Sequence, residues 1–217
     1  MPTTTFFNLP EEKRERFVEV ALDEFALNDY RNASVTNMVK ELGIAKGSVY
    51  QYFTNKKELY HYLIQLATEQ KLQVTKPLIQ KTGADLWKWY RKLFAKSLMF
   101  DLQHPVLGSF MLNVTHERNS PEVGSLVLTH KRESMDFYIA MLKQFQKKGN
   151  LSKKIDLVPT AYILSQTAFG FLDGLCIEQN IDLREHARNH EPVTSVGEEA
   201  VKSYLKKITT VLSGTVS

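Results

Sequence analysis

Apolar positions recur every third or fourth residue along most of the 217-residue chain, the spacing that places side chains on one face of an α-helix. The alternating runs and Asn-Gly turns that would indicate β-strands do not occur. We therefore expect an all-α fold. It divides into a flexible arm over residues 1–9, a head of three short helices over residues 10–56, and a helical body over residues 57–217.

The head is centred on residues 34–57, which read SVTNMVKELGIAKGSVYQYFTNKK. Gly43 divides this stretch into two helical stripes, because a residue without Cβ tolerates the positive φ of a tight turn. Ser34 can cap the first helix with its hydroxyl. In the second helix Val49 and Phe53 point inward, and the outward face carries Gly47, Tyr50 and Gln51.

Two helices joined by a short glycine-containing turn form a helix-turn-helix, whose second helix lies in the major groove of DNA. Glutamine can bond bidentately to adenine, tyrosine can reach phosphate or the thymine methyl, and glycine permits close approach. Four lysines against one glutamate give the stretch a net charge of +3, which favours phosphate contacts. The alternative is a helical hairpin within a bundle; the outward face favours binding to double-stranded DNA. The lysines are Lys40, Lys46, Lys56 and Lys57.

The run K-G-x-x-Y-x-Y-F-x-x-K-x-x-L at residues 46–59, preceded by FALNDY and SVTNMV, resembles the N-terminal domain of the TetR family of one-component transcription regulators. The resemblance covers about residues 10–60. Ala45 replaces the usual hydroxyl residue, which removes a helix cap worth roughly 1 kcal/mol, and Asp29 stands where the family commonly has glycine. The resemblance implies DNA contacts from Thr36, Asn37, Ala45, Lys46, Gly47, Tyr50, Gln51, Tyr52 and Lys56.

The body is predicted to be a series of helices that ends with one at about residues 194–212, and residues 179–192 are polar and predicted to form a loop. The helix at 157–178 is apolar or small on two sides and therefore needs two partners. We assign its second face, with one face of the last helix, to a four-helix interface between two copies of the chain. The predicted interface residues are Ile163, Thr167, Gly170, Gly174, Ile177, Val201, Tyr204, Leu205 and Ile208.

The aromatic residues of the body have two interpretations, a plain core or the lining of a cavity for a hydrophobic or amphipathic molecule. Core packing is favoured for each residue taken singly, whereas for the set the resemblance implies an effector pocket. Its candidate lining is Trp87, Tyr90, Phe94, Phe110, His130, Phe137, Tyr138, Met141, Tyr162, Ser165, Gln166 and Phe169.

Composition and motif content exclude several classes of protein and kinds of site, but they do not by themselves indicate a function. The chain carries a net charge of +4 and has no phosphate-binding, nucleophile or metalloprotease motif, so we expect no enzyme and no cofactor. His186 and His190 have zinc-compatible spacing, but they lie in a polar segment, which favours a solvated surface and no metal. The lone Cys176 excludes an intrachain disulfide, and the absence of a signal-peptide layout or a bilayer-length apolar run indicates a cytoplasmic protein without a membrane partner.

Together these features predict a homodimeric regulator, most simply a repressor, that binds a palindromic operator and responds to a small effector. Two other classes of protein stay open. One is a ligand-independent DNA-organising or division-control protein on the same scaffold. The other is an all-helical enzyme or carrier that retains the head.

Overall fold

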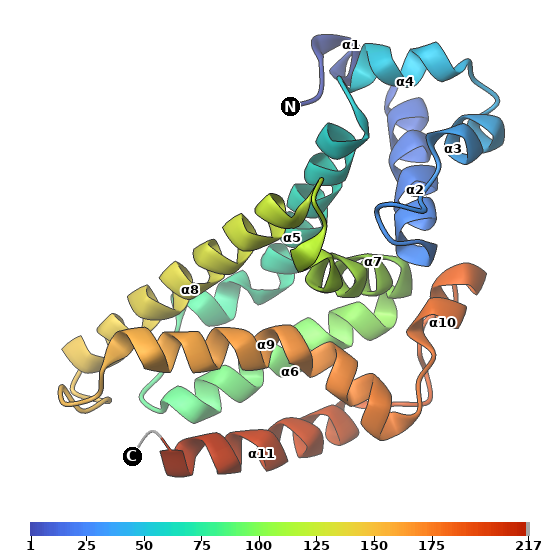
Figure 1. Cartoon of the computed structure of the whole chain (residues 1–217). Helices are drawn as coiled ribbons and strands as arrows, with labels where there is room; N and C mark the ends of the chain where they lie inside the picture. Colours follow the sequence, from blue (N-terminus) through green and yellow to red (C-terminus); the bar gives the residue numbers. More distant parts are fainter. Residues whose placement is uncertain (216–217) are drawn as a thin grey trace. The chain divides into compact units, whose positions relative to one another are not determined.

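The computed structural model describes residues 1–215, and every regular element in that range is helical (Figure 1), which confirms the predicted fold class. The first six elements are α1 Thr4–Phe7, α2 Glu11–Leu27, α3 Val35–Leu42, α4 Lys46–Tyr52, α5 Lys56–Gln80 and α6 Leu86–Gln103. The others are α7 Pro105–His116, the 3-10 turn η1 Glu117–Asn119, α8 Gly124–Lys147, α9 Leu157–Gln179, α10 Leu183–Asn189 and α11 Glu198–Thr215.

The chain forms two compact units. The first unit consists of residues 1–70, 104–127 and 183–192, and the second of residues 71–103, 128–182 and the chain from residue 193 onward. The unit that contains the three-helix head thus also contains α7 and α10. The functional boundary expected after residue 56 stays a prediction.

The head has the predicted helix-turn-helix geometry. The Ser34 hydroxyl accepts a 3.3 Å hydrogen bond from the Asn37 N–H and caps α3. Gly43 ends α3 with φ of 64°, the left-handed conformation for which glycine is favoured. Val49 and Phe53 are buried as expected, so the stripe of α4 faces the head core.

The core of the first unit continues from α2 into α7. The Ser109 hydroxyl donates to the Ala26 carbonyl at 2.8 Å, and the Asn113 amide donates to the carbonyls of Phe25 and Ala26 at 3.0 and 2.9 Å. These carbonyls belong to the last turn of α2, where no further helical N–H can reach them. Side chains of α7 therefore satisfy the C-terminal end of the first head helix.

Two predictions about irregular segments are wrong. The arm expected at residues 1–9 contains α1, and its Phe6 is fully buried. The loop expected at residues 179–192 contains α10, whose Leu183 and Ala187 are buried. Both helices are too short to show periodicity, and tertiary packing rather than local pattern decides them.

In the second unit α6, α9 and α11 lie side by side (Figure 1). The Tyr90 hydroxyl of α6 donates to the Leu164 carbonyl of α9 at 2.7 Å, deep in the core. Pro77 lies within α5, which continues to Gln80, and a left-handed Gly83 with φ of 72° follows between α5 and α6.

Candidate nucleic-acid interface

The outward surface of α3 and α4 consists of exposed side chains. Lys46 links the two helices, because its ammonium donates to the Thr36 hydroxyl at 3.1 Å. Ala45 precedes α4 without a side-chain cap, as its missing hydroxyl predicts. The predicted DNA-contacting residues exposed here are Thr36, Asn37, Ala45, Lys46, Gly47, Tyr50 and Gln51.

Gly47 has no structural reason to be glycine in the free protein. A Cβ built at this position meets no protein atom within 4 Å, and the backbone is in its helical region. Glycine in a helix costs up to about 1 kcal/mol relative to alanine. Bare backbone on an exposed helix face, retained at that cost, is what close approach by a partner requires.

Tyr50 and Tyr52 lie on different sides of α4. The Tyr50 side chain is 49% exposed. The Tyr52 ring is half-buried, with its centroid 5.6 Å from that of Phe17 and 6.0 Å from that of Phe6. Tyr52 therefore supports the head core in addition to any contact that it makes with DNA.

Lys56 bonds the protein's own backbone, and its predicted phosphate contact stays a prediction. Its ammonium donates to the Tyr30 carbonyl at 2.6 Å and to the Ala33 carbonyl at 2.9 Å, with a longer contact of 3.4 Å to the Arg31 carbonyl. It also lies 4.5 Å from the centroid of the Tyr30 ring. Burial lowers the Lys56 pKa, and surrounding carboxylates oppose that effect. Lys56 thus stabilises the turn between α2 and α3, and its donors are directed at the protein's own backbone.

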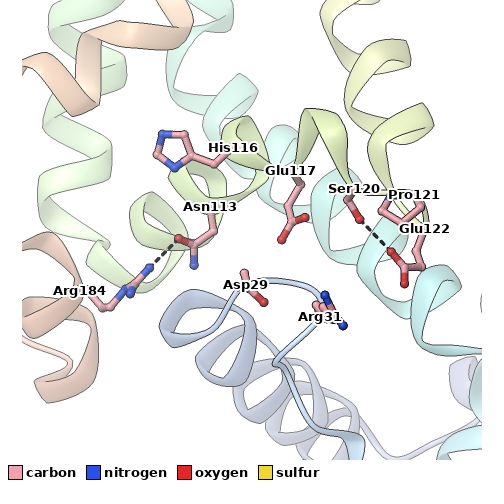
Figure 2. Close-up of a pocket in the computed structure, with 9 residues that line it drawn as sticks. All are labelled: Asp29, Arg31, Asn113, His116, Glu117, Ser120, Pro121, Glu122 and Arg184. Carbon is pink, nitrogen blue, oxygen red and sulfur yellow. Dashed lines mark hydrogen bonds between the residues drawn. The ribbon is translucent and has the colours of Figure 1, made fainter.

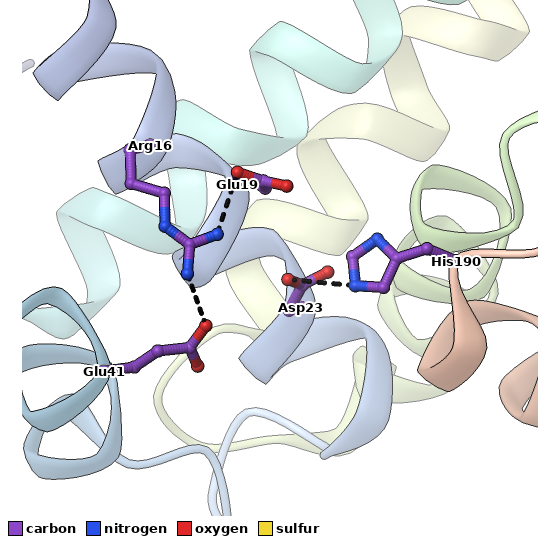
Figure 3. Close-up of polar contacts among 5 residues, drawn as sticks. All are labelled: Arg16, Glu19, Asp23, Glu41 and His190. Atoms are coloured by element: carbon purple, nitrogen blue, oxygen red, sulfur yellow. Dashed lines mark hydrogen bonds and ion pairs between the residues drawn. The ribbon is translucent and has the colours of Figure 1, made fainter.

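Acidic residues of α2 are held by two basic groups (Figure 3). Arg16 donates to Glu19 at 3.0 Å and to Glu41 at 2.8 Å, which ties α2 to α3. One oxygen of Asp23 lies 3.4 Å from His190, and the other is buried with no hydrogen-bond partner among the described residues. Burial raises the pKa of Asp23 to about 6, against the attraction of His190.

A charged pocket of about 590 Å³ lies in the first unit (Figure 2). Several of its charged and polar groups contact one another or the backbone: Glu117 accepts from the Tyr30 N–H at 2.6 Å, and Arg184 donates to Asn113 at 3.1 Å. Separate segments supply the lining, so no single motif could have indicated it. The lining is Asp29, Arg31, Asn113, His116, Glu117, Ser120, Pro121, Glu122 and Arg184, and none of these is a predicted effector contact.

Five predicted effector residues are joined by ring contacts in the second unit: Trp87, Tyr90, Phe94, Phe137 and Tyr138. The Tyr90 centroid lies 4.7 Å from Phe94, 6.0 Å from Tyr138 and 5.7 Å from Phe171, a residue that the sequence analysis missed. His130 and Phe169 form a separate pair, with centroids 5.9 Å apart. The predicted effector residues that are buried or half-buried in this unit are Trp87, Tyr90, Phe94, His130, Phe137, Tyr138, Met141, Ser165, Gln166 and Phe169. Burial lowers the pKa of His130, which favours its neutral form.

Two predicted effector residues lie elsewhere. Phe110 belongs to the first unit, where its ring packs 5.4 Å from Tyr60 and 6.3 Å from Phe25. Tyr162 is 55% exposed on α9. Neither lines the interior of the second unit. The predicted inward face of α9 is rotated enough to place Tyr162 outside and Phe171 inside.

The predicted subunit interface is partly exposed and partly core. Ile163, Gly170 and Ile177 are exposed on α9, whereas Val201 and Leu205 of α11 are fully buried in the chain's own core and cannot present their side chains to a partner.

Gly174 has an internal explanation. A Cβ at Gly174 would collide with the Tyr204 hydroxyl of the same chain. The glycine therefore admits α11 rather than a second copy, and Tyr204 itself is buried. Thr167 and Ile208 are half-buried.

Residues 17–63 match the sequence family described as "Bacterial regulatory proteins, tetR family". An HTH-type transcriptional regulator of Staphylococcus aureus strain USA300 is 38% identical over 55 residues, which is 25% of this chain and 30% of the relative's length. The crystal structure of a TetR family transcriptional regulator from Chloroflexus aurantiacus J-10-FL is 30% identical, with 98% of this chain and 96% of that chain covered and a TM-score of 0.74. The chain belongs to the TetR family.

The TetR fold extends to more distant structures. FadR from Bacillus subtilis, a transcriptional regulator solved in complex with stearoyl-CoA, is 16% identical over 88% of this chain and 96% of its own, with a TM-score of 0.66. At that identity the similarity shows the fold alone. The S. aureus match covers less than a third of that relative, so the whole protein's activity and partners are matters for proposal. Among the described residues, no helix is both long and apolar enough to cross a membrane.

Proposed function

We propose that this TetR-family protein is a sequence-specific DNA-binding repressor. The observation that carries the proposal is the surface of α4, where Gly47, Tyr50 and Gln51 are exposed and no atom of residues 1–215 covers the bare backbone at Gly47. Such a helix fits the major groove, with Gln51 placed for a bidentate contact to adenine and Lys46 for a phosphate. A regulator of this kind acts on the chromosome in the cytoplasm.

We propose that the active form is a homodimer on a palindromic operator. Large apolar side chains exposed on α9, including Ile163 and Ile177, support a second copy as the partner. Two heads would then enter successive major grooves about 34–36 Å apart.

The effector is proposed to be a hydrophobic or amphipathic small molecule bound by the second unit. Two observations support this class: the aromatic cluster around Tyr90, and the fold shared with a regulator that was solved with stearoyl-CoA. Because residues of α5 belong to both compact units, a change in its second-unit segment can be passed along the helix to the head. A preference of about 100-fold between two dimer states, equivalent to roughly 2.7 kcal/mol, is enough to release DNA.

The experiment is selection of duplexes from a random-sequence DNA library by the purified full chain, followed by affinity measurements on the selected duplex and a scrambled one. We expect a palindromic consensus and discrimination of at least about 1000-fold near physiological salt. Fatty acids and their thioesters are then added as effector probes, and release of the selected duplex is expected. No enriched sequence, or equal affinity for selected and scrambled DNA, would contradict the proposed function.

A further inference from the structure

The seven residues of α4 cannot hold their own position. Helices this short are unstable in isolation, and α4 has no side-chain cap at Ala45. At the other end its last carbonyls have no helical N–H to accept from. The orientation of α4 therefore depends on what packs against it, and within the first unit both α1 and α3 do so.

The N-terminal segment satisfies the end of α4 through one residue. The Thr3 hydroxyl donates to the Gln51 carbonyl at 2.6 Å. The Thr3 N–H donates to the Tyr52 carbonyl at 2.9 Å. Two of the final carbonyls of α4 are thus bonded to a single residue outside the helix, and one of them belongs to Gln51, the proposed base-contacting residue.

Phe6 fixes this segment to the head. Its ring is fully buried, and the ring centroid lies 5.0 Å from that of Phe53, 5.7 Å from that of Phe17 and 5.5 Å from that of Tyr62. It therefore contacts α2, the end of α4 and α5 together. The main chain connects Thr3 to this buried ring within one turn of helix, so the position of Thr3 is set by the core.

We infer that Thr3 and Phe6 are positioning residues for the recognition helix: residues 3–6, here called the N-terminal clip, hold the C-terminal end of α4 in the orientation in which Gln51 meets a base edge. The inference rests on the proposed function. It adds that sequence discrimination depends on a hydroxyl that does not itself touch DNA.

The test uses Thr3→Val in the full chain, which removes the hydroxyl but keeps the β-branch and the N–H bond to Tyr52. Thr3→Ser restores the hydroxyl, and Thr5→Val is the matched control, because Thr5 is exposed and its side chain has no hydrogen bond among the described residues. Affinities are measured for the duplex selected by the wild-type protein and for a scrambled duplex. We expect Thr3→Val to lower the affinity for the selected duplex about three- to tenfold, as loss of one hydrogen bond implies. The affinity for scrambled DNA should stay nearly unchanged. Thr3→Ser and Thr5→Val should bind like the wild type.

Amide hydrogen exchange of residues 46–53, measured without DNA, separates this inference from the proposed function. Thr3→Val should exchange faster in this peptide while peptides from α6 and α9 keep their rates, which also shows that the variant is folded. Unchanged exchange at residues 46–53, or equal losses on selected and scrambled DNA, would overturn the inference. If the wild type itself failed to discriminate between duplexes, the proposed function would be contradicted. The exchange rates would still decide whether the N-terminal clip positions α4.

Discussion

His190 Nε2 lies 3.4 Å from Asp23 Oδ2, and this contact joins the residue after α10 to the middle of α2. Asp23 is mostly buried, and burial raises its pKa from 3.8 to about 6. The ion pair with His190 opposes that rise, Glu19 and Glu41 add to it, and Arg16 lowers it. The native state therefore binds a proton on Asp23 more tightly than the unfolded chain does.

Stability should therefore depend on pH in a way that Asp23→Asn removes. Because the native state binds this proton more tightly than the unfolded chain, Asp23 favours the native state below pH 3.8, and the contribution is lost as pH rises through about 6. Relative to the wild type, Asp23→Asn should gain on the order of 1–3 kcal/mol in unfolding free energy between pH 4 and 7. Urea unfolding at several pH values measures this difference. The exposed carboxylate variant Asp136→Asn is the control, and parallel curves for wild type and Asp23→Asn would contradict the assignment.

Lys56 should matter for stability more than for DNA. Its ammonium bonds the carbonyls of Tyr30 and Ala33, so Lys56→Met leaves these groups without their donor. We expect a loss of about 1–3 kcal/mol in unfolding free energy, against little change for the neighbouring Lys57→Met. Thermal and urea unfolding measure both variants. If Lys56→Met were as stable as the wild type, the backbone contacts of Lys56 would not stabilise the fold. The phosphate contact that the family resemblance implies would then be the better explanation of this lysine.

Gln51 and Lys46 should have separable effects on DNA. Gln51→Ala should reduce discrimination at one base pair by about 1–3 kcal/mol, since a bidentate contact to a base is lost. Lys46→Gln should lower the affinity for selected and scrambled duplexes alike. It should also reduce the slope of log affinity against log salt concentration by about 0.9. Fluorescence anisotropy at several salt concentrations measures both quantities. Similar losses on both duplexes for Gln51→Ala would mean that this side chain does not contact a base.

The sequence predicted the head well because its features are local. Ser34 needs only the N–H groups of the next turn to act as a cap, and Gly43 is favoured by its own φ, so neighbouring residues suffice for the prediction. The helices α6, α8 and α9 are long enough for the helical period of apolar positions to be visible in the sequence. The family match covers the same segment.

What the sequence could not show depends on contacts between distant segments. Lys56 looks like any lysine of a DNA-binding motif until the α2–α3 turn, more than 20 residues earlier, is placed against it. Gly174 looks like half of a small-residue interface until Tyr204 occupies the space above it. The charged pocket combines α7, α10 and the α2–α3 turn, and no periodicity connects them.

The dimer interface should respond to a charge on α9. Ile177 is 75% exposed, so Ile177→Glu is tolerated by the single chain but would place an unpaired carboxylate in the proposed interface. We expect the dimer to dissociate about tenfold or more readily, as measured by light scattering on a size-exclusion column across a concentration series. Leu128→Glu, at a less exposed apolar position on α8, is the control and should remain dimeric. A dimer unaffected by Ile177→Glu would locate the interface on another surface.

Gly47→Ala should change stability and DNA binding in opposite directions. In the free chain the new methyl meets no protein atom within 4 Å, and alanine is the better helix former, so unfolding free energy should rise by up to about 1 kcal/mol. On DNA the same methyl stands where backbone approaches the duplex, so affinity should fall, by about tenfold for a clash of roughly 1.4 kcal/mol. If the substitution destabilised the head, both the unfolding free energy and the DNA affinity would fall. If residue 47 were remote from DNA, the unfolding free energy would rise without any loss of DNA affinity. Urea unfolding together with anisotropy on the selected duplex therefore distinguishes contact with DNA from either alternative, and a Gly47→Ala protein that binds like the wild type would show that α4 does not approach DNA at Gly47.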